Sequence, residues 1–103
     1  MKVLFVCLGN ICRSPTAKAV LASLARQYGL SITVDSAGTA AYHIGHAPDP
    51  RTQSAALERG IDMSSLSARQ VQVADFYEFD FVFAMDKENL LQLNRLRRQD
   101  AIA

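Results

Sequence analysis

The segment Val3-Leu4-Phe5-Val6-Cys7-Leu8-Gly9-Asn10-Ile11-Cys12-Arg13-Ser14-Pro15 decides how this chain folds. Its first half is apolar and nearly continuous, which is typical of a strand covered on both faces, and we expect that strand over residues 1–7. A tight loop follows, opened by Cys7 and closed by Arg13 in the spacing C-x5-R-S. Ser14 and Pro15 are the signals of a helix start, an N-cap followed by the first helical position. The segment therefore predicts a strand, a loop and a helix N-terminus in direct succession.

The loop has the composition of a binding site for a tetrahedral anion. A chain that bends into a helix N-terminus turns successive backbone N–H groups inward, toward one concave point. Gly9 permits the positive φ or the close approach that such a bend usually needs, and Asn10 is among the few side chains that tolerate it. Arg13 adds a planar, permanently charged fork that binds two oxygens of a phosphate. Besides Arg13, the candidate phosphate-binding residues are Leu8, Gly9, Asn10, Ile11, Cys12 and Ser14.

Cys7 opens this loop, and its place there predicts a nucleophile. A positive nest of N–H groups favours the thiolate, which is the reactive form of cysteine. A thiolate facing a bound phosphorus implies a phosphocysteine intermediate, with the loop amides and Arg13 stabilising the equatorial oxygens. The alternative is a buried structural cysteine, because the pattern C-x5-R alone also occurs by chance. The apolar strand before the loop and the Ser-Pro pair after it favour the catalytic interpretation.

Composition narrows the class of protein. The 103 residues make one domain, and with 50% hydrophobic and 20% charged residues the profile is that of an ordinary globular protein. A net charge of +1 gives no general attraction to nucleic acid, and no apolar run is long enough for a membrane span. Two cysteines in one loop are no secreted disulfide framework, so we expect a reducing, cytoplasmic location.

His43 and His46 lack the spacing of metal ligands. We expect them to be surface histidines, and we expect neither a metal nor another cofactor.

The next stretch of the chain predicts a crossover between parallel strands. A helix is expected from Ser14 until Gly29, which is a natural helix stop, and a short strand over Ser31–Asp35. A strand, helix and strand of these lengths imply a right-handed parallel crossover, with ligands at the carboxyl ends of the strands. One buried stripe of the helix is expected to consist of Ala17, Val20, Leu21, Leu24 and Tyr28.

Further elements are expected in the second half. Asp49-Pro50 again pairs an N-cap with a first helical position, and Gly60 ends that helix. A short helical turn is expected over Val71–Tyr77, and an aromatic strand over Phe79–Ala84. Asp86 is expected to cap a last helix, whose apolar face carries Leu90, Leu93 and Leu96. Strands alternating with helices predict an α/β domain.

These motifs together resemble the low-molecular-weight protein tyrosine phosphatases. Residues 6–15, V-C-L-G-N-I-C-R-S-P, match the active-site signature of that family, and later motifs follow in family order over nearly the whole chain. The later motifs are Asp35-Ser36-Ala37-Gly38, Gly45 with Pro48-Asp49-Pro50-Arg51, Ala68-Arg69-Gln70, and Met85-Asp86 with Asn89-Leu90. The resemblance implies a three-layer domain with a small parallel sheet flanked by helices, of flavodoxin-like topology. It also implies hydrolysis of protein phosphotyrosine and aryl phosphates through a phosphocysteine, without metal or cofactor.

The resemblance assigns roles to single residues as well. Ser36 matches a serine that, with the equivalents of Asn10 and Ser14, holds the anion loop by hydrogen bonding. Tyr42 stands where the family has an aromatic wall of the substrate cleft. Cys12 has two interpretations, a small space-filling residue or a redox partner that forms a reversible bridge with an oxidised Cys7, as in the family.

The chain departs from the family pattern at its C-terminus. Family members continue with a further strand and a closing helix, and an Asp-Pro-aromatic loop between them protonates the leaving oxygen. No Asp-Pro-aromatic tripeptide occurs in the 103 residues, so no general acid is assigned and residues 1–103 are expected to form a domain incomplete at its C-terminus. General acid catalysis typically contributes about 10²–10⁴-fold. The missing strand would leave an exposed sheet edge and invite self-association.

Other function classes remain open at this point. The main alternative is an oxyanion-binding, catalytically impaired fragment without the general-acid loop. Arsenate reductase, which resembles this family, needs further cysteines downstream of Cys12, and none occurs. A phosphocysteine carrier of the sugar phosphotransferase type does not need the arginine-closed loop. We therefore expect phosphotyrosine proteins and phosphate-like anions as partners, and neither nucleic acid nor a membrane.

Overall fold

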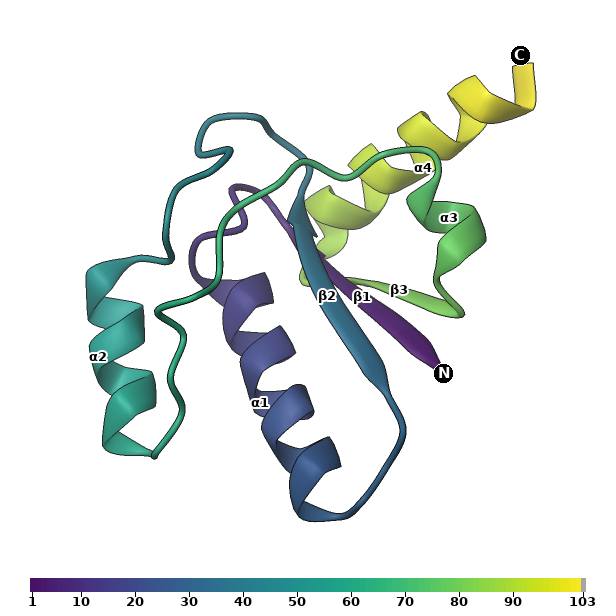
Figure 1. Ribbon diagram of the computed structural model, residues 1–103. Coiled ribbons are helices and arrows are strands. Elements are labelled where there is room, and N and C mark those ends of the chain that lie inside the picture. Colours follow the sequence, from purple (N-terminus) through teal and green to yellow (C-terminus); the bar gives the residue numbers. More distant parts are fainter. Residues whose placement is uncertain (103) are drawn as a thin grey trace.

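Helices and strands alternate along the chain as the sequence predicts. The computed structural model describes residues 1–102, with side chains for residues 1–98 (Figure 1). In chain order the elements are β1 (Lys2–Cys7), α1 (Arg13–Gln27), β2 (Thr33–Gly38), α2 (Pro50–Glu58), α3 (Asp75–Glu78), β3 (Phe81–Ala84) and α4 (Lys87–Ile102). Within this described part, no helix is both long and apolar enough to cross a membrane.

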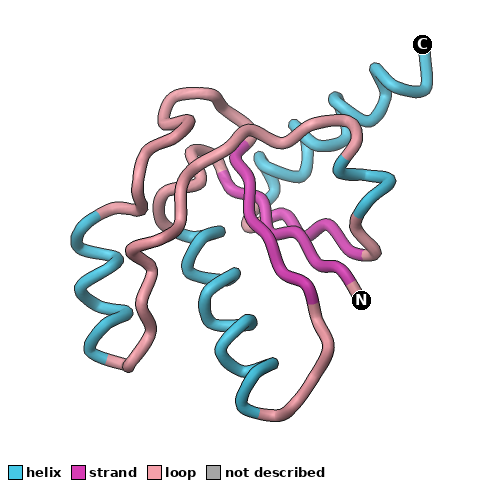
Figure 2. The backbone as a smooth tube through the Cα atoms, viewed as in Figure 1, coloured by secondary structure: helices cyan, strands magenta, loops and turns pink. Residues whose placement is uncertain are grey.

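The strands form one parallel sheet in the order β2-β1-β3, so β1 lies in the centre (Figure 2). The register pairs Cys7 with Gly38 and Val6 with Ala84, which brings the carboxyl ends of all three strands to one edge. Helix α1 packs on β1 and β2, while α3 and α4 cover the opposite face (Figure 1). The expected α/β architecture, a small parallel sheet flanked by helices, is therefore confirmed.

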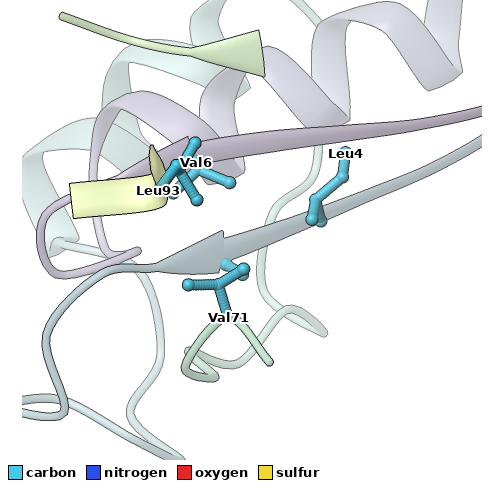
Figure 3. Close-up of a cluster of buried hydrophobic side chains, with 5 residues drawn as sticks. Leu4, Val6, Val71 and Leu93 are labelled. Carbon is cyan, nitrogen blue, oxygen red and sulfur yellow. The ribbon is translucent and has the colours of Figure 1, made fainter. Parts of the chain in front are cut away.

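The main core lies between the sheet and α4 (Figure 3). Leu4 and Val6 of β1 are fully buried, and Val71 and Leu93 pack against them. Burial of each large aliphatic side chain contributes about 1.5–3 kcal/mol of stability. Because Leu4 and Val6 fix the central strand, they also fix the position of Cys7 at its end.

The expected buried stripe of α1 is confirmed only in part: Ala17 and Leu21 are half-buried, but the other three members are exposed. Val20, Leu24 and Tyr28 are 38%, 43% and 69% exposed, whereas the buried residues of α1 are Ser14, Pro15 and Ala25. The helix therefore leaves three of its larger apolar residues exposed. The periodicity identified a helix correctly but not the face that it buries.

Strand boundaries also differ from the sequence expectation. β2 was expected over Ser31–Asp35 but runs over Thr33–Gly38, because its pairing with β1 continues to the end of that strand. β3 is shorter than the expected Phe79–Ala84 and begins at Phe81. The helical turn expected over Val71–Tyr77 is shorter and later in the chain, since α3 begins at Asp75 and ends at Glu78.

Two predicted helix caps are confirmed. The Asp49 carboxylate accepts from the Arg51 N–H at 2.8 Å at the start of α2, and the Asp86 carboxylate accepts from the Asn89 N–H at 2.8 Å at the start of α4. Of the apolar face expected on α4, Leu93 and Leu96 pack on the core, while Leu90 is 51% exposed. Helix α2 begins shortly after residues 40–47, and the start of α4 brings Asp86 to Arg13 of the anion loop.

Candidate active site

The loop between β1 and α1 folds around the sulfur of Cys7. Cys7 is 3% exposed, and the Asn10 backbone N–H donates to its Sγ at 3.2 Å. Asn10 has φ 58°, the left-handed conformation that the sequence predicted for this bend. The loop therefore directs the Asn10 backbone N–H toward the sulfur, just before the N-terminus of α1.

Ser14 serves the loop and does not cap the helix. The structure corrects the expected N-cap: Cys12 occupies that position without a side-chain cap, and α1 already begins at Arg13, which puts Pro15 at its third position. The Ser14 hydroxyl lies 2.9 Å from Cys7 Sγ and donates to Asn10 Oδ1 at 2.8 Å. A hydroxyl has one proton, so in the thiol form the S–H donates to Ser14 Oγ. In the thiolate form the sulfur only accepts, and the Ser14 proton turns to it.

The end of β2 supports the loop from beside it. Asn10 Nδ2 donates to the Ser36 carbonyl at 3.4 Å, and Ser14 Oγ lies 3.4 Å from the Ala37 carbonyl. Beyond the strand, the N–H groups of Thr39 and Ala40 donate to the carbonyls of Cys7 and Leu8, each at 2.9 Å. Ser36 is buried, and its contact with Asn10 runs through its backbone carbonyl.

Gly38 is the point of closest approach between β2 and the loop. A Cβ at this position would lie 2.7 Å from the Leu8 carbonyl oxygen and 3.2 Å from the Asn10 backbone nitrogen. Real Cβ atoms do not approach backbone so closely, so the loop conformation requires glycine here. On its other side, the Gly38 N–H donates to the Arg69 carbonyl at 2.8 Å.

Arg13 stands at the end of the loop, held by one carboxylate. Its Nη1 donates to Asp86 Oδ2 at 2.9 Å, and the two side chains are 49% and 41% exposed. Hydrogen bonds from the Asn89 backbone N–H and from Arg13 hold the pKa of Asp86 below its usual range. Most of the donors of the Arg13 fork remain available to an anion.

A pocket of about 230 Å³ opens over the loop. It is lined by Cys7, Leu8, Gly9, Ile11, Cys12, Arg13, Tyr42 and His43. A larger cavity, of about 500 Å³, lies between α3, β3 and α4, and neither Cys7 nor Arg13 lines it. We therefore take the smaller pocket as the candidate active site.

The pocket loop, residues 40–47, contributes two rings to this site. Tyr42, the predicted wall of the substrate cleft, lines the pocket and is 73% exposed. The expectation that His43 is merely a surface residue is wrong, because His43 is half-buried and lines the same pocket. Its position beside Tyr42 in one loop is the sequence signal that points to it. His46 is exposed and does not line this pocket.

Cys12 is a free, exposed thiol whose Sγ lies 3.2 Å from the Thr52 hydroxyl of α2. Cys7 is likewise free but buried. Among the residues that the structure describes, no group of three or more His, Cys, Asp or Glu side chains is arranged to hold a metal ion.

Comparison with known proteins supports one family. The family model for "Low molecular weight phosphotyrosine protein phosphatase" matches residues 2–102. The low molecular weight phosphotyrosine protein phosphatase of Schizosaccharomyces pombe is 47% identical, over 100% of this chain and 67% of its own length. The human protein of the same name is 50% identical, over 94% of this chain and 62% of its own length. The chain thus spans roughly two thirds of the length of these curated relatives.

Solved structures are similar over the same share of their length. YfkJ from Bacillus subtilis superposes with a TM-score of 0.93 at 44% identity, covering 96% of this chain and 64% of that protein. A protein tyrosine phosphatase from Entamoeba histolytica, with Hepes in its active site, has a TM-score of 0.88 at 44% identity over 96% of this chain and 65% of its own. The Drosophila arginine phosphatase DARP has a TM-score of 0.92 at 41% identity over 96% of this chain and 63% of its own.

Proposed function

Because this chain belongs to the low molecular weight phosphotyrosine protein phosphatase family, we propose that it hydrolyses phosphomonoesters of protein phosphotyrosine and of small aryl phosphates through a phosphocysteine at Cys7. One observation carries the proposal: the Cys7 sulfur accepts a loop N–H in a pocket that Arg13 also lines. The Entamoeba relative that holds Hepes, a sulfonate, in its active site adds support for an oxyanion site.

The proposed reaction has two steps. In the first, Cys7 Sγ attacks phosphorus, the S–P bond forms and the P–O bond to the aryl group breaks, while the loop N–H groups and Arg13 bind the three other phosphate oxygens. The departing aryl oxide takes a proton from solvent. In the second step water attacks the phosphocysteine, the S–P bond breaks, and inorganic phosphate and the thiolate are released. The Ser14 hydroxyl, 2.9 Å from Sγ, stabilises the thiolate before the first step and after the second.

The pocket lining favours an aromatic leaving group. Leu8, Ile11 and Tyr42 offer apolar contact, and an exposed tyrosine ring stacks on another aromatic ring with a gain of about 0.5–1.5 kcal/mol. The similarity to an arginine phosphatase supports a second candidate substrate, phosphoarginine. Its guanidinium leaving group is best held by a carboxylate, and within the described part of the chain no carboxylate lines this pocket. Matched peptides carrying phosphotyrosine or phosphoarginine distinguish the two candidates by their kcat/KM.

Cys12 is proposed to protect the nucleophile by bridging to an oxidised Cys7. Both thiols are free, which suits action in a reducing compartment, and we assign the protein to the cytoplasm. Brief peroxide treatment of the wild-type chain should give a bridge that dithiothreitol reverses. The Cys12→Ser chain should instead lose activity irreversibly.

Self-association through β3 is a further part of the proposal. Among the described strands β3 pairs with β1 alone, and its Phe81 and Phe83 are 47% and 46% exposed. An apolar edge strand without lysine or proline pairs readily with another strand. Sedimentation should show dimers or larger species that Phe83→Lys dissociates; a wild-type chain that stays monomeric at high concentration would contradict this part.

The central test uses p-nitrophenyl phosphate, whose good leaving group does not need a proton donor. The 103-residue chain and its Cys7→Ser variant are mixed with substrate at mildly acidic pH, and product release is followed from the first turnover. Cys7-dependent release supports the phosphatase, and a burst followed by slow turnover locates the limit in hydrolysis of the phosphocysteine. Phosphate or vanadate that raises Tm without any release would support the alternative, an oxyanion-binding chain with impaired catalysis.

A further inference from the structure

His43 lies against the anion loop itself. Its ring packs over Gly9 so closely that a Cβ on Gly9 would lie 2.9 Å from His43 Cδ2 and 3.6 Å from His43 Nε2. The same ring lines the pocket that Cys7 and Arg13 line. An anion bound in the loop would therefore meet the His43 imidazole at the rim of its pocket.

The backbone around His43 is held on both sides. Before it, the Ala40 N–H donates to the Leu8 carbonyl at 2.9 Å, which ties the pocket loop to the anion loop. After it, the Gly45 N–H donates to the Ala68 carbonyl at 2.7 Å, and the Ala68 N–H donates to the His46 carbonyl at 2.8 Å. These bonds fix the turn that carries His43 relative to Cys7.

The charges around the pocket would not neutralise a second positively charged group. Arg13 shares its charge with Asp86, and within the described residues no carboxylate lines the pocket. The titratable groups that face His43 are Cys7, Cys12 and Arg13 from the anion loop, and Tyr42 and His46 from its own loop. In the same part of the chain neither ring nitrogen of His43 makes a hydrogen bond, so both are available to a ligand.

We propose that His43 is a pH-dependent anion-binding residue, which as an imidazolium donates an N–H and adds a positive charge to the oxyanion site beside Arg13. Imidazole is the side chain that changes charge between about pH 5 and 8, so this contribution is present at the acidic end of that range and lost at the other. The inference rests on the proposed function only in using the same anion loop. The ligand class is a tetrahedral dianion, for which a second cation at the rim adds most.

The test measures sulfate binding to the Cys7→Ser chain. Sulfate keeps the same charge over this pH range, and serine removes the thiol beside the anion, which leaves no ionisable group at position 7. We expect calorimetry to give a Kd about three- to tenfold lower at about pH 5.5 than at about pH 7.5, as for one added unit charge at a partly exposed site. Reciprocally, the NMR titration of His43 should move to higher pH when sulfate is added.

Two matched variants decide whether His43 is responsible. His43→Asn in the same background should bind sulfate equally at both pH values, with the weaker affinity seen at about pH 7.5. His46→Asn, which changes the neighbouring imidazole outside the pocket, should keep the full pH dependence. If His43→Asn has a lowered Tm, His43→Gln replaces it in the comparison.

Three results would overturn the inference. A sulfate affinity that does not change with pH would contradict the role of His43. The proposal of Cys7-dependent hydrolysis would be unaffected by this result. If the pH dependence of sulfate binding is lost in His46→Asn but kept in His43→Asn, the added charge belongs to His46. Sulfate that fails to bind at either pH would contradict both this inference and the anion site on which the proposed function depends.

Discussion

Two arginines of this molecule bind carboxylates in different ways, Arg13 at the anion loop and Arg69 behind β2. Arg13 donates one hydrogen bond to one partner, Asp86, and both side chains are more than 40% exposed. Arg69 donates through Nη1 and Nη2 to the two oxygens of Asp75, each at 3.0 Å, and through Nε to Asp35 at 3.1 Å. Asp75 is 5% exposed.

The difference separates an arginine that is available to a ligand from one that is part of the framework. Burial works against the charge of Arg69, but its hydrogen bond and charge pairing with Asp75 and its pairing with Asp35 outweigh burial and raise its pKa. All three of its side-chain nitrogens donate to carboxylates, so the fork is directed at Asp35 and Asp75 and not at an anion site. The Arg13 fork keeps most of its donors. We therefore expect Arg13 substitutions to affect activity and Arg69 or Asp75 substitutions to affect stability.

The largest effect is expected for Arg13→Ala. Loss of the fork removes the side chain that binds the equatorial oxygens, and kcat/KM for p-nitrophenyl phosphate should fall about 10³-fold, in line with loss of preorganised oxyanion donors. Tm should change little, because the side chain is exposed and alanine favours helix. Arg51→Ala, which removes an arginine from the first turn of α2, is the matched control and should retain activity. Equal losses of kcat/KM in Arg13→Ala and Arg51→Ala would contradict a special role of Arg13 in anion binding.

Asp75→Ala should act mainly on stability. It leaves the half-buried Arg69 with one carboxylate and removes the acceptor of the Gln72 N–H, so the free energy of unfolding should fall by about 3 kcal/mol. Urea denaturation measures this loss. The kcat/KM of the folded variant should stay within a few-fold of wild type. Asp62→Ala, which removes an exposed acceptor of the Ser64 N–H, should lower the free energy of unfolding clearly less.

Gly38→Ala tests the residue of β2 that contacts both the anion loop and Arg69. The added Cβ would press on the backbone of Leu8 and Asn10, so the loop must shift, and kcat/KM should fall about 10- to 100-fold, since small misplacements of a reacting group cost this much. Gly60→Ala is the control, because no atom lies within 4 Å of its Cβ position although its φ is +77°. That variant should lose some stability and no activity. Full activity in Gly38→Ala would show that the loop tolerates this contact.

The smallest effect is expected for Asp86→Asn. Asparagine still caps α4, but a negative charge leaves the vicinity of the anion, so sulfate should bind the Cys7→Ser background about two- to fivefold more tightly. Because the pKa of Asp86 is lowered, the carboxylate keeps its charge until the pH falls below the usual aspartate range, and the difference should persist down to that pH. Weaker sulfate binding in the variant would mean that Asp86 orients Arg13 for the anion.

Much of the site could be predicted because its chemistry is local in the sequence. The C-x5-R-S spacing after an apolar strand predicted where Cys7 and Arg13 lie, and the structure brings both to one pocket. Asn10 was expected in a left-handed bend and has φ 58°. These features depend on a few neighbouring residues, so a short pattern specifies them.

The remaining features depend on segments distant in the sequence. The apolar period of α1 does not reveal that the buried residues of this helix are Ser14, Pro15 and Ala25. Serine is a favoured N-cap residue, but the Ser14 hydroxyl instead forms hydrogen bonds with the Cys7 sulfur and the Asn10 side-chain amide. His43 reaches the pocket because hydrogen bonds to Leu8 and Ala68 fold its loop back, and those partners are not visible in the local pattern.

The most direct test of the account is to trap the intermediate on Cys7. The wild-type chain is mixed with p-nitrophenyl phosphate, quenched in acid within the first turnover, and examined by intact-mass and peptide mass spectrometry. We expect a mass increase of one phosphoryl group, located on the peptide that contains Cys7 and absent from the Cys7→Ser chain. Product release without that adduct, or a phosphoryl group on another residue, would contradict it.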